Sequence, residues 1–154
     1  MTHSGAGMKL VDPDETVVLV IGTSSNAEAR DRPLADRLKA EIDRRGAGHA
    51  YRRAVVVGDE WYLEHRTFHH NPTITIGGPG ANGVTEEFTA MLPTVYARDE
   101  RVFVQAELDG EIKRVALWGA DAAATAQAVE VFGTDGLLDG LLERIWRFRA
   151  GLMV

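Results

Sequence analysis

Three short apolar segments of this chain each run into a glycine-containing turn, and a helical pattern follows every turn. The apolar segments are residues 17–21, 73–76 and 115–118, and the turns begin at Gly22, Gly77 and Gly119. Short β-branched runs that end at glycine are typical of buried strands in a sheet covered by helices. Ligands of such sheets usually bind at the carboxyl ends of the strands. The pattern therefore predicts an α/β fold and a place for function.

The remaining pattern predicts one Rossmann-like layered domain over residues 16–154, with residues 1–15 as a flexible tail. We expect a mixed sheet of about five strands with helices on both faces. Residues 102–108 and 111–118 flank Asp109-Gly110, which is the strongest short signal for a β-hairpin. The hairpin 102–118 should therefore make the last two strands antiparallel neighbours.

The start of the first helix is open to two interpretations. Ser25 followed by Glu28 matches a capping box, which would start the helix at Asn26. Pro33 would then lie inside that helix and kink it. Alternatively, Asp31 caps a helix that begins after it, with proline in the favourable first turn. We prefer the second interpretation, which leaves residues 23–30 as a loop or a separate turn.

Charge and composition exclude several classes of function. The 154 residues carry a net charge of −6 and no cysteine. Without cysteine, thiol catalysis, zinc–cysteine sites and disulfides are excluded, and the acidic balance argues against a nucleic-acid partner. No apolar run approaches the ~20 residues of a membrane span, and no charged-then-apolar leader opens the chain. We therefore expect a cytoplasmic protein that binds neither nucleic acid nor membrane.

The first two turns are candidate ligand-binding loops. In the first, backbone N–H groups and hydroxyls could cradle a phosphate, although neither the dinucleotide fingerprint nor the P-loop is present. Its alternative role is a polar connection in which Ser25 caps the helix. In the second, Glu86 and Glu87 would repel an anion, which favours a sharp crossover with positive φ instead. The candidate ligand-binding residues are Gly22, Thr23, Ser24, Ser25, Asn26, Gly77, Gly78 and Gly80.

A further strand is predicted at residues 54–57, and the acids and histidines that follow it are the candidates for acid–base chemistry. Asp59 ends that strand, where Rossmann-type folds place an acid on a ribose hydroxyl. With Glu60 and His65 it could instead supply a general base, whereas solvated loop acids are the plainer alternative. His65 and His69 have the four-residue spacing of helical zinc-binding pairs, but the following Asn-Pro disfavours helix there. We expect no metal and no cofactor.

The last predicted helix, residues 137–149, carries a wide apolar face. Leu138, Leu142 and Trp146 lie on it at helical spacing, beside Leu141, Ile145 and Phe148. If the sheet leaves this face uncovered, it could pair with a second copy to form a homo-oligomer, a dimer in the simplest case. Ordinary core packing is the alternative.

Two motifs carry a resemblance to a known family. Ile76-Gly-Gly-Pro-Gly-Ala-Asn82 precedes Val84-Thr85, and Trp118-Gly-Ala-Asp121 precedes Thr125 and Ala128. These motifs resemble a pattern in the C-terminal modules of S-layer-like surface proteins, where a G-G-P-x-x-N turn follows one strand and a G-x-D-x-x-x-T-x-x-A segment opens a helix after another. The resemblance covers residues 73–133 and implies a structural, non-catalytic α/β module.

Two functional hypotheses follow from the sequence. The first is a non-catalytic binding or self-assembly module, because no complete catalytic constellation is recognisable. The second is an enzyme or sensor that acts on a phosphorylated small molecule or nucleotide. It would bind phosphate at the turn after Gly22 and use Asp59, Glu60 or His65 as polar or acid–base groups.

Overall fold

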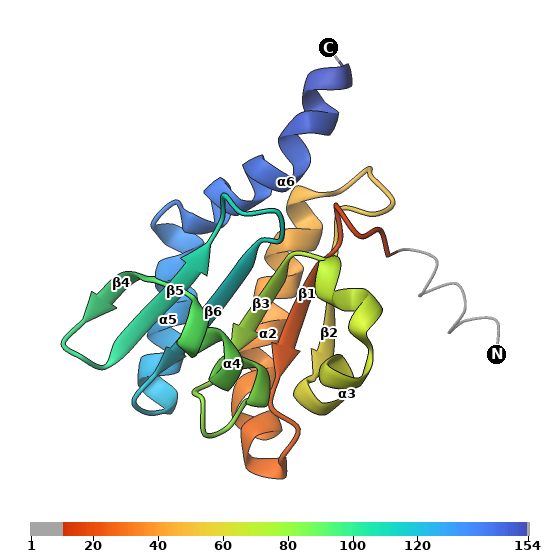
Figure 1. The fold of residues 1–154 in the computed structure, drawn as a ribbon. Helices are drawn as coiled ribbons and strands as arrows, with labels where there is room; N and C mark the ends of the chain where they lie inside the picture. The colour runs from red at the N-terminus through yellow and green to blue at the C-terminus, as the bar shows by residue number, and fades with distance from the viewer. Residues whose placement is uncertain (1–10, 154) are drawn as a thin grey trace.

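Six strands form a single mixed sheet in the order β2-β1-β3-β6-β5-β4 (Figure 1). The computed structural model describes the backbone of residues 11–153 and the side chains of residues 11–146. Strands β2, β1, β3 and β6 are parallel, and β5 and β4 extend the sheet by antiparallel pairing. The strands are β1 (Val17–Ile21), β2 (Ala54–Gly58), β3 (Thr73–Ile76), β4 (Thr94–Arg98), β5 (Val102–Glu107) and β6 (Arg114–Gly119).

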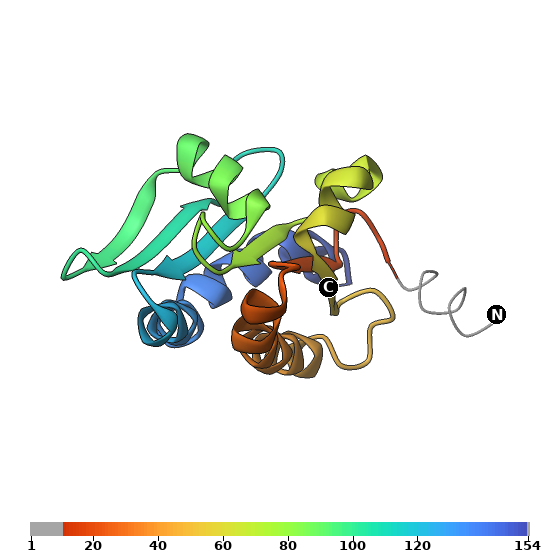
Figure 2. The same ribbon diagram turned by 90° about the horizontal axis from the view of Figure 1, so that it is seen from below.

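Helices cover both faces of this sheet, as Figure 2 shows. Helices α2, α5 and α6 lie on one face, and α3 and α4 lie on the other. Among the described residues, no helix is long and apolar enough to cross a membrane. The helices are α2 (Ser25–Arg45), α3 (Asp59–Glu64), the short 3-10 helix η1 (Arg66–His70), α4 (Gly83–Met91), α5 (Ala122–Thr134) and α6 (Leu137–Met153).

Strand β1 supplies the centre of the core on both faces. Its side chains alternate, so Val17, Leu19 and Ile21 pack toward α2, α5 and α6. Val18 and Val20 pack toward α3 and α4. All five side chains are at most 1% exposed, which explains the continuous β-branched run in the sequence.

The structure confirms the α/β fold with helices on both faces and the antiparallel hairpin of β5 and β6. It adds the edge strand β4, which the sequence pattern did not predict. Three residues connect β4 and β5, and the first two, Asp99 and Glu100, have φ angles of 57° and 55°. Such left-handed pairs are typical of type I′ hairpin turns.

The preferred start of the first helix was wrong. Helix α2 begins at Ser25 and contains Pro33, and the Ser24 side chain caps it by accepting a hydrogen bond from the backbone of Ala27. Proline removes the helical N–H that would bond the carbonyl of Ala29. Both residues are exposed, so water can replace that donor and the helix continues.

The packed part of the chain begins before residue 16, so the predicted tail was drawn too long. The side-chain amide of Asn71 donates to the carbonyl of Asp12 at 2.9 Å. The indole of Trp146 donates to the carbonyl of Glu15 at 3.0 Å. These bonds connect residues 12–15 to the amino-terminal ends of the strands and to α6. The rest of the predicted tail, residues 1–10, lies outside the described residues.

Candidate functional site

A pocket of about 400 Å³ opens at the carboxyl ends of β1 and β2. The two strand ends lie side by side because Ile21 is in register with Gly58. This is the edge of the sheet at which the sequence predicts a ligand. The pocket is lined by Ile21, Gly22, Thr23, Glu28, Arg32, Gly58, Glu60, Trp61 and Glu64.

Asp59 joins three segments around this pocket. Its Oδ1 atom accepts a hydrogen bond from the Thr23 hydroxyl and another, of 2.8 Å, from the backbone of Glu60. Its Oδ2 atom accepts from the backbone of Gly83 at 2.8 Å, at the start of α4. The residue is only 9% exposed. Both of its oxygens therefore accept hydrogen bonds from within the chain and connect these loops.

The hydroxyl groups of Thr23 and Ser24, in the turn after β1, form hydrogen bonds within the chain. Thr23 bonds Asp59, and Ser24 caps α2, so the cap lies one residue before the predicted Ser25. Gly22 packs so closely on the next loop that a Cβ there would lie 2.0 Å from the carbonyl oxygen of Ala81. Ser25 and Asn26 are exposed at the start of the helix. Two of the hydroxyls proposed to bind phosphate are thus already engaged.

The charges that line the pocket are mostly negative. Glu28, Glu60 and Glu64 face one cation, Arg32, whose Nε atom already donates to Glu28 at 3.2 Å. Carboxylates repel a phosphate and attract a cation. The half-buried Trp61 adds an aromatic wall of the kind that attracts cations. The chemistry of the lining therefore suits a cationic group better than an anion.

The two candidate histidines are engaged with different partners. The His65 ring stacks on Trp61 with centroids 3.9 Å apart, and its Nδ1 atom lies 2.7 Å from the Trp61 carbonyl oxygen. The His69 ring stacks on Tyr62, and its Nε2 atom lies 2.8 Å from the Tyr62 carbonyl oxygen. Within residues 11–146, no group of three or more histidine, aspartate or glutamate side chains is placed to hold a metal ion.

Asn82 fills the crevice between β1 and β3, where the strand order changes direction. Its Nδ2 group donates to the carbonyls of Val20 and Ile76, both at 3.0 Å. Its Oδ1 atom caps α4 by accepting from the backbone of Val84 and Thr85. The protein's own side chain thus occupies the position at which many α/β proteins bind their ligand.

The glycine turn that begins at Gly77 leads from β3 to Asn82. Gly77 has a φ of 113°, which favours glycine, and its N–H donates to Leu117 at 3.0 Å. The carbonyl of Gly78 accepts from the backbone of Ala81 and Asn82. Gly80 is exposed at the tip. The sharp crossover with positive φ, which the sequence offered as an alternative, is the observed role of Gly77.

Asp31 is a buried carboxyl group beside that turn. Its side chain has no solvent exposure, and Oδ1 lies 3.4 Å from the Arg30 guanidinium. Among the described residues Oδ2 has no hydrogen-bond partner, and it packs against Gly77 so tightly that a Cβ there would approach within 2.6 Å. Burial raises the pKa of this carboxyl, and Arg30 opposes the increase.

The apolar face of α6 is covered within the chain. Leu138, Leu142 and Trp146 are 0%, 4% and 8% exposed and belong to the main core. They are therefore not a free surface for a second copy, and the alternative of ordinary core packing describes them. Phe148 lies outside the described side chains.

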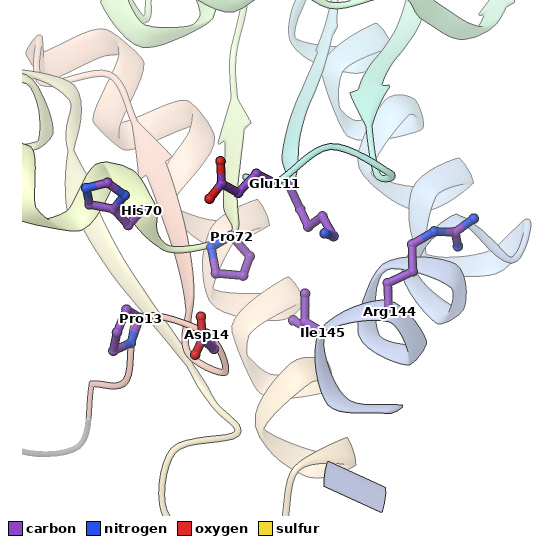
Figure 3. Close-up of a pocket in the computed structure, with 8 residues that line it drawn as sticks. Pro13, Asp14, His70, Pro72, Glu111, Arg144 and Ile145 are labelled. Atoms are coloured by element: carbon purple, nitrogen blue, oxygen red, sulfur yellow. The ribbon is translucent and has the colours of Figure 1, made fainter. Parts of the chain in front are cut away.

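A smaller pocket of about 140 Å³ lies at the opposite, amino-terminal ends of the strands (Figure 3). Acidic and basic side chains both line it, among them Asp14, Glu111 and Arg144. The cations already have partners, because Arg144 donates to Asp109 at 2.9 Å and Lys113 donates to the carbonyl of Gly110 at 2.7 Å. This pocket offers no cation that a bound anion could engage without breaking an existing contact.

Comparison with protein-family models and with curated proteins gives no match to this chain. The residues that carry the resemblance to S-layer-like modules have structural roles at helix starts. Asn82 and Asp121 cap α4 and α5. The Thr85 hydroxyl donates to Thr75 at 2.8 Å, and Thr125 accepts from the backbone of Gly119 at 3.1 Å.

Some residues that the sequence singled out line the pocket between β1 and β2, and others of its lining residues were not candidates for ligand binding. Gly22, Thr23 and Glu60 were candidates and do line it, whereas Glu28 was considered only as part of a capping box and Trp61 was not considered. Helical spacing offered a signal, because Glu60 and Glu64 are four residues apart and share a face. Asn82 also carried a signal, because asparagine before a helical run is a favoured N-cap.

Proposed function

We propose that this chain is a non-catalytic binding or self-assembly module. The observation that carries the proposal is the engagement of its best catalytic candidate. Both carboxylate oxygens of Asp59 accept hydrogen bonds, from Thr23, Glu60 and Gly83, and these bonds hold three loops together. The resemblance to S-layer-like modules supports the same non-catalytic role.

The self-assembly part is tested by sedimentation velocity and light scattering over a range of concentrations. We expect reversible association that becomes measurable above about 50 µM, a weak affinity in the range of transient contacts. A strict monomer throughout that range would remove self-assembly from the proposal and leave ligand or partner binding.

A second candidate function is small-ligand binding in the pocket between β1 and β2. The phosphorylated ligand expected from the sequence is disfavoured by the carboxylates of Glu28, Glu60 and Glu64. We propose instead that an occupant of this pocket would carry a cationic group, which Trp61 and the two exposed carboxylates of α3 could bind.

Thermal unfolding against a ligand panel separates the two ligand classes. The panel contains nucleotides, sugar phosphates, inorganic phosphate, choline and butylguanidinium. A ligand at 100 times its Kd adds about 2.7 kcal/mol, which would raise the Tm of a domain of this size by roughly 5–10 °C. Glu60→Gln and Glu64→Gln should weaken a cation-induced shift, whereas Glu87→Gln, outside the pocket, should not. A shift for the phosphorylated class alone would favour the sensor or enzyme hypothesis.

We also propose a cytoplasmic location for this module. The acidic charge and the cysteine-free composition are compatible with that compartment. Fractionation of cells that express the full chain with a C-terminal epitope tag tests it, and recovery in the envelope fraction would contradict it.

A further inference from the structure

Two carboxylates of α3 line the pocket between β1 and β2. Glu60 and Glu64 are four residues apart, so their side chains share one face of the helix. Glu28, which lines the pocket from α2, pairs with Arg32 at 3.1 Å. Among residues 11–146, the side chains of Glu60 and Glu64 have no such ion pair and no hydrogen bond. A cation that enters the pocket therefore meets two carboxylates that are not engaged elsewhere in the described chain.

The aromatic part of the lining favours one kind of cation. Trp61 lies between the two glutamates in sequence, and its ring is held by stacking on His65, with centroids 3.9 Å apart. A guanidinium group is planar, stacks on aromatic rings and donates several hydrogen bonds to carboxylates at once. A lysine ammonium is a compact charge without that planar shape. The combination of one indole and two carboxylates therefore suits an arginine side chain.

The last turns of α6 carry arginines on a helix that leaves the core. Trp146 is 8% exposed and belongs to the main core. Figure 1 shows that the helix then continues beyond the sheet and the helices around it. Its sequence there is Arg147-Phe148-Arg149-Ala150-Gly151-Leu152-Met153, with two arginines and no acid. A protruding helix end of this kind can enter a concave site on another molecule.

Arginines on the body of the protein are placed differently. Arg45, Arg52 and Arg101 each pair with an acid of their own chain. Arg32 is likewise paired, although it lines the pocket itself. The end of α6 is therefore the segment of this chain whose charge and shape best complement the pocket.

The pocket and the end of α6 lie at opposite ends of the molecule. In Figure 1 the carboxyl ends of β1 and β2 lie at the bottom, whereas the last turns of α6 lie at the top. The length of the sheet separates them. The helix end therefore does not reach the pocket of its own chain, and only a second copy can bring the two together.

We propose that the cationic occupant of the pocket is an arginine from residues 147–149 of a second copy of this chain. Its guanidinium group would lie against Trp61 and bond the carboxylates of Glu60 and Glu64. Because the two surfaces differ, the contact is heterologous, and each pair of copies keeps one unused pocket and one unused helix end. Copies can therefore add head to tail, which gives an open chain unless the rotation between copies closes a ring.

This inference rests on the self-assembly part of the proposed function and names the two surfaces that meet. Exposed ion pairs are weak and screened by salt, so we expect a Kd of about 50 µM that rises several-fold between about 50 mM and about 500 mM NaCl. The pocket variant, Glu60→Lys with Glu64→Lys, should raise the Kd roughly tenfold or more. The control, Asp36→Lys with Glu87→Lys, reverses two exposed charges outside the pocket and should change it less than about twofold.

A mixing experiment tests the head-to-tail arrangement directly. The helix variant is Arg147→Glu with Arg149→Glu, and it keeps an intact pocket. The pocket variant keeps an intact helix end. By sedimentation velocity, each variant alone should be monomeric where the wild type associates, whereas the mixture should form a heterodimer that does not grow further. Formation of that heterodimer would also show that both variants are folded, since each contributes one intact surface.

A peptide tests the pocket without relying on assembly. The probe is a labelled peptide of residues 144–154 with both ends blocked, and fluorescence anisotropy measures its binding. We expect it to bind the wild type, and to bind the pocket variant at least roughly tenfold more weakly. The same peptide with Arg147→Gln and Arg149→Gln is the control and should lose its affinity for the wild type.

The outcomes separate this inference from the proposed function. A heterodimer in the mixture alone, with peptide binding that needs the arginines, would support the contact. A wild type that associates as strongly as both variants would show that another surface is used, which overturns this inference and leaves self-assembly standing. A thermal shift with choline but no binding of the peptide would leave the pocket as a small-ligand site and overturn this inference alone. A monomeric wild type that does not bind the peptide would overturn both this inference and self-assembly.

Discussion

The side-chain amide of Asn82 donates a 3.0 Å hydrogen bond to the carbonyl of Val20, and thereby ties the start of α4 to the end of β1. The same amide bonds the carbonyl of Ile76 at the end of β3. One side chain thus bridges two neighbouring strands at the point where ligands of α/β sheets usually enter. The open pocket lies instead between the carboxyl ends of β1 and β2.

Asn82→Ala should destabilise the fold strongly. The side chain is 1% exposed, and its removal leaves two carbonyls and two N–H groups without their partner. Each buried polar group left unpaired costs about 1–3 kcal/mol, so we expect a loss of about 3 kcal/mol or more in urea unfolding. Asn26→Ala, at an exposed position of α2, is the control and should change stability by less than about 0.5 kcal/mol. A loss below about 1 kcal/mol for Asn82→Ala would mean that water replaces these bonds.

Gly22 and Gly80 should respond oppositely to alanine, although both were candidate ligand residues. A Cβ on Gly22 would lie 2.0 Å from the carbonyl oxygen of Ala81, whereas a Cβ on Gly80 would meet nothing within 4 Å. We expect Gly22→Ala to lower the free energy of unfolding by more than about 2 kcal/mol, and Gly80→Ala to change it by less than about 0.5 kcal/mol. Equal effects in the two variants would contradict the close packing of the two turns.

Glu100→Gly should stabilise the protein. Glu100 has a φ of 55°, a left-handed conformation that costs a residue with a Cβ roughly 1–2 kcal/mol and glycine very little. Because glycine loses more entropy on folding, we expect a net gain of about 0.5–1 kcal/mol, measured by thermal and chemical unfolding. Glu111→Gly, an exposed loop position where φ is not positive, should give no gain. A similar gain at both positions would point to charge, not backbone conformation, as the cause.

Local sequence patterns were sufficient to predict most of the fold. The runs that become β1, β3 and β6 are buried on both faces, so their sequences alone indicate strands that end at glycine. Strand β4 is different, because its short and largely exposed segment forms a strand through pairing with β5, a contact that composition does not reveal. Pro33 misled the prediction of α2, since local rules could not show that its side of the helix faces water.

The candidate site was predictable in position but not in chemistry. The carboxyl edge of β1 and β2 follows from the strand–turn–helix pattern, and Gly22 and Thr23 do line the pocket there. The engagement of Asp59 depends on loops 36 and 24 residues away in sequence, at Thr23 and Gly83. The hydrogen bonds of Asn82 to β1 and β3 likewise depend on how α4 packs against the sheet. Tertiary contacts of this kind decide whether a polar residue is free to act.

Asp31 gives the fold a pH dependence of definite sign. Burial raises the pKa of its carboxyl above the ordinary value of 3.8, which the unfolded chain retains. Between these two pKa values the folded state holds the proton and the unfolded state has lost it. The free energy of unfolding contributed by this group is therefore fully present below pH 3.8 and is lost as the pH rises through the raised value.

Asp31→Asn should remove this dependence, because the amide stays neutral at nearly the same volume. We expect the variant to gain stability over the wild type as the pH rises from 4 toward 8, and the two proteins to converge near the pKa of the unfolded carboxyl, 3.8. Urea unfolding at several pH values measures the difference. Asp36→Asn, which removes an exposed charge from the same helix, controls for net charge. If the advantage of Asp31→Asn were instead constant with pH, the benefit would come from packing or hydrogen bonding beside Gly77, and the buried carboxyl would not be titrating with folding.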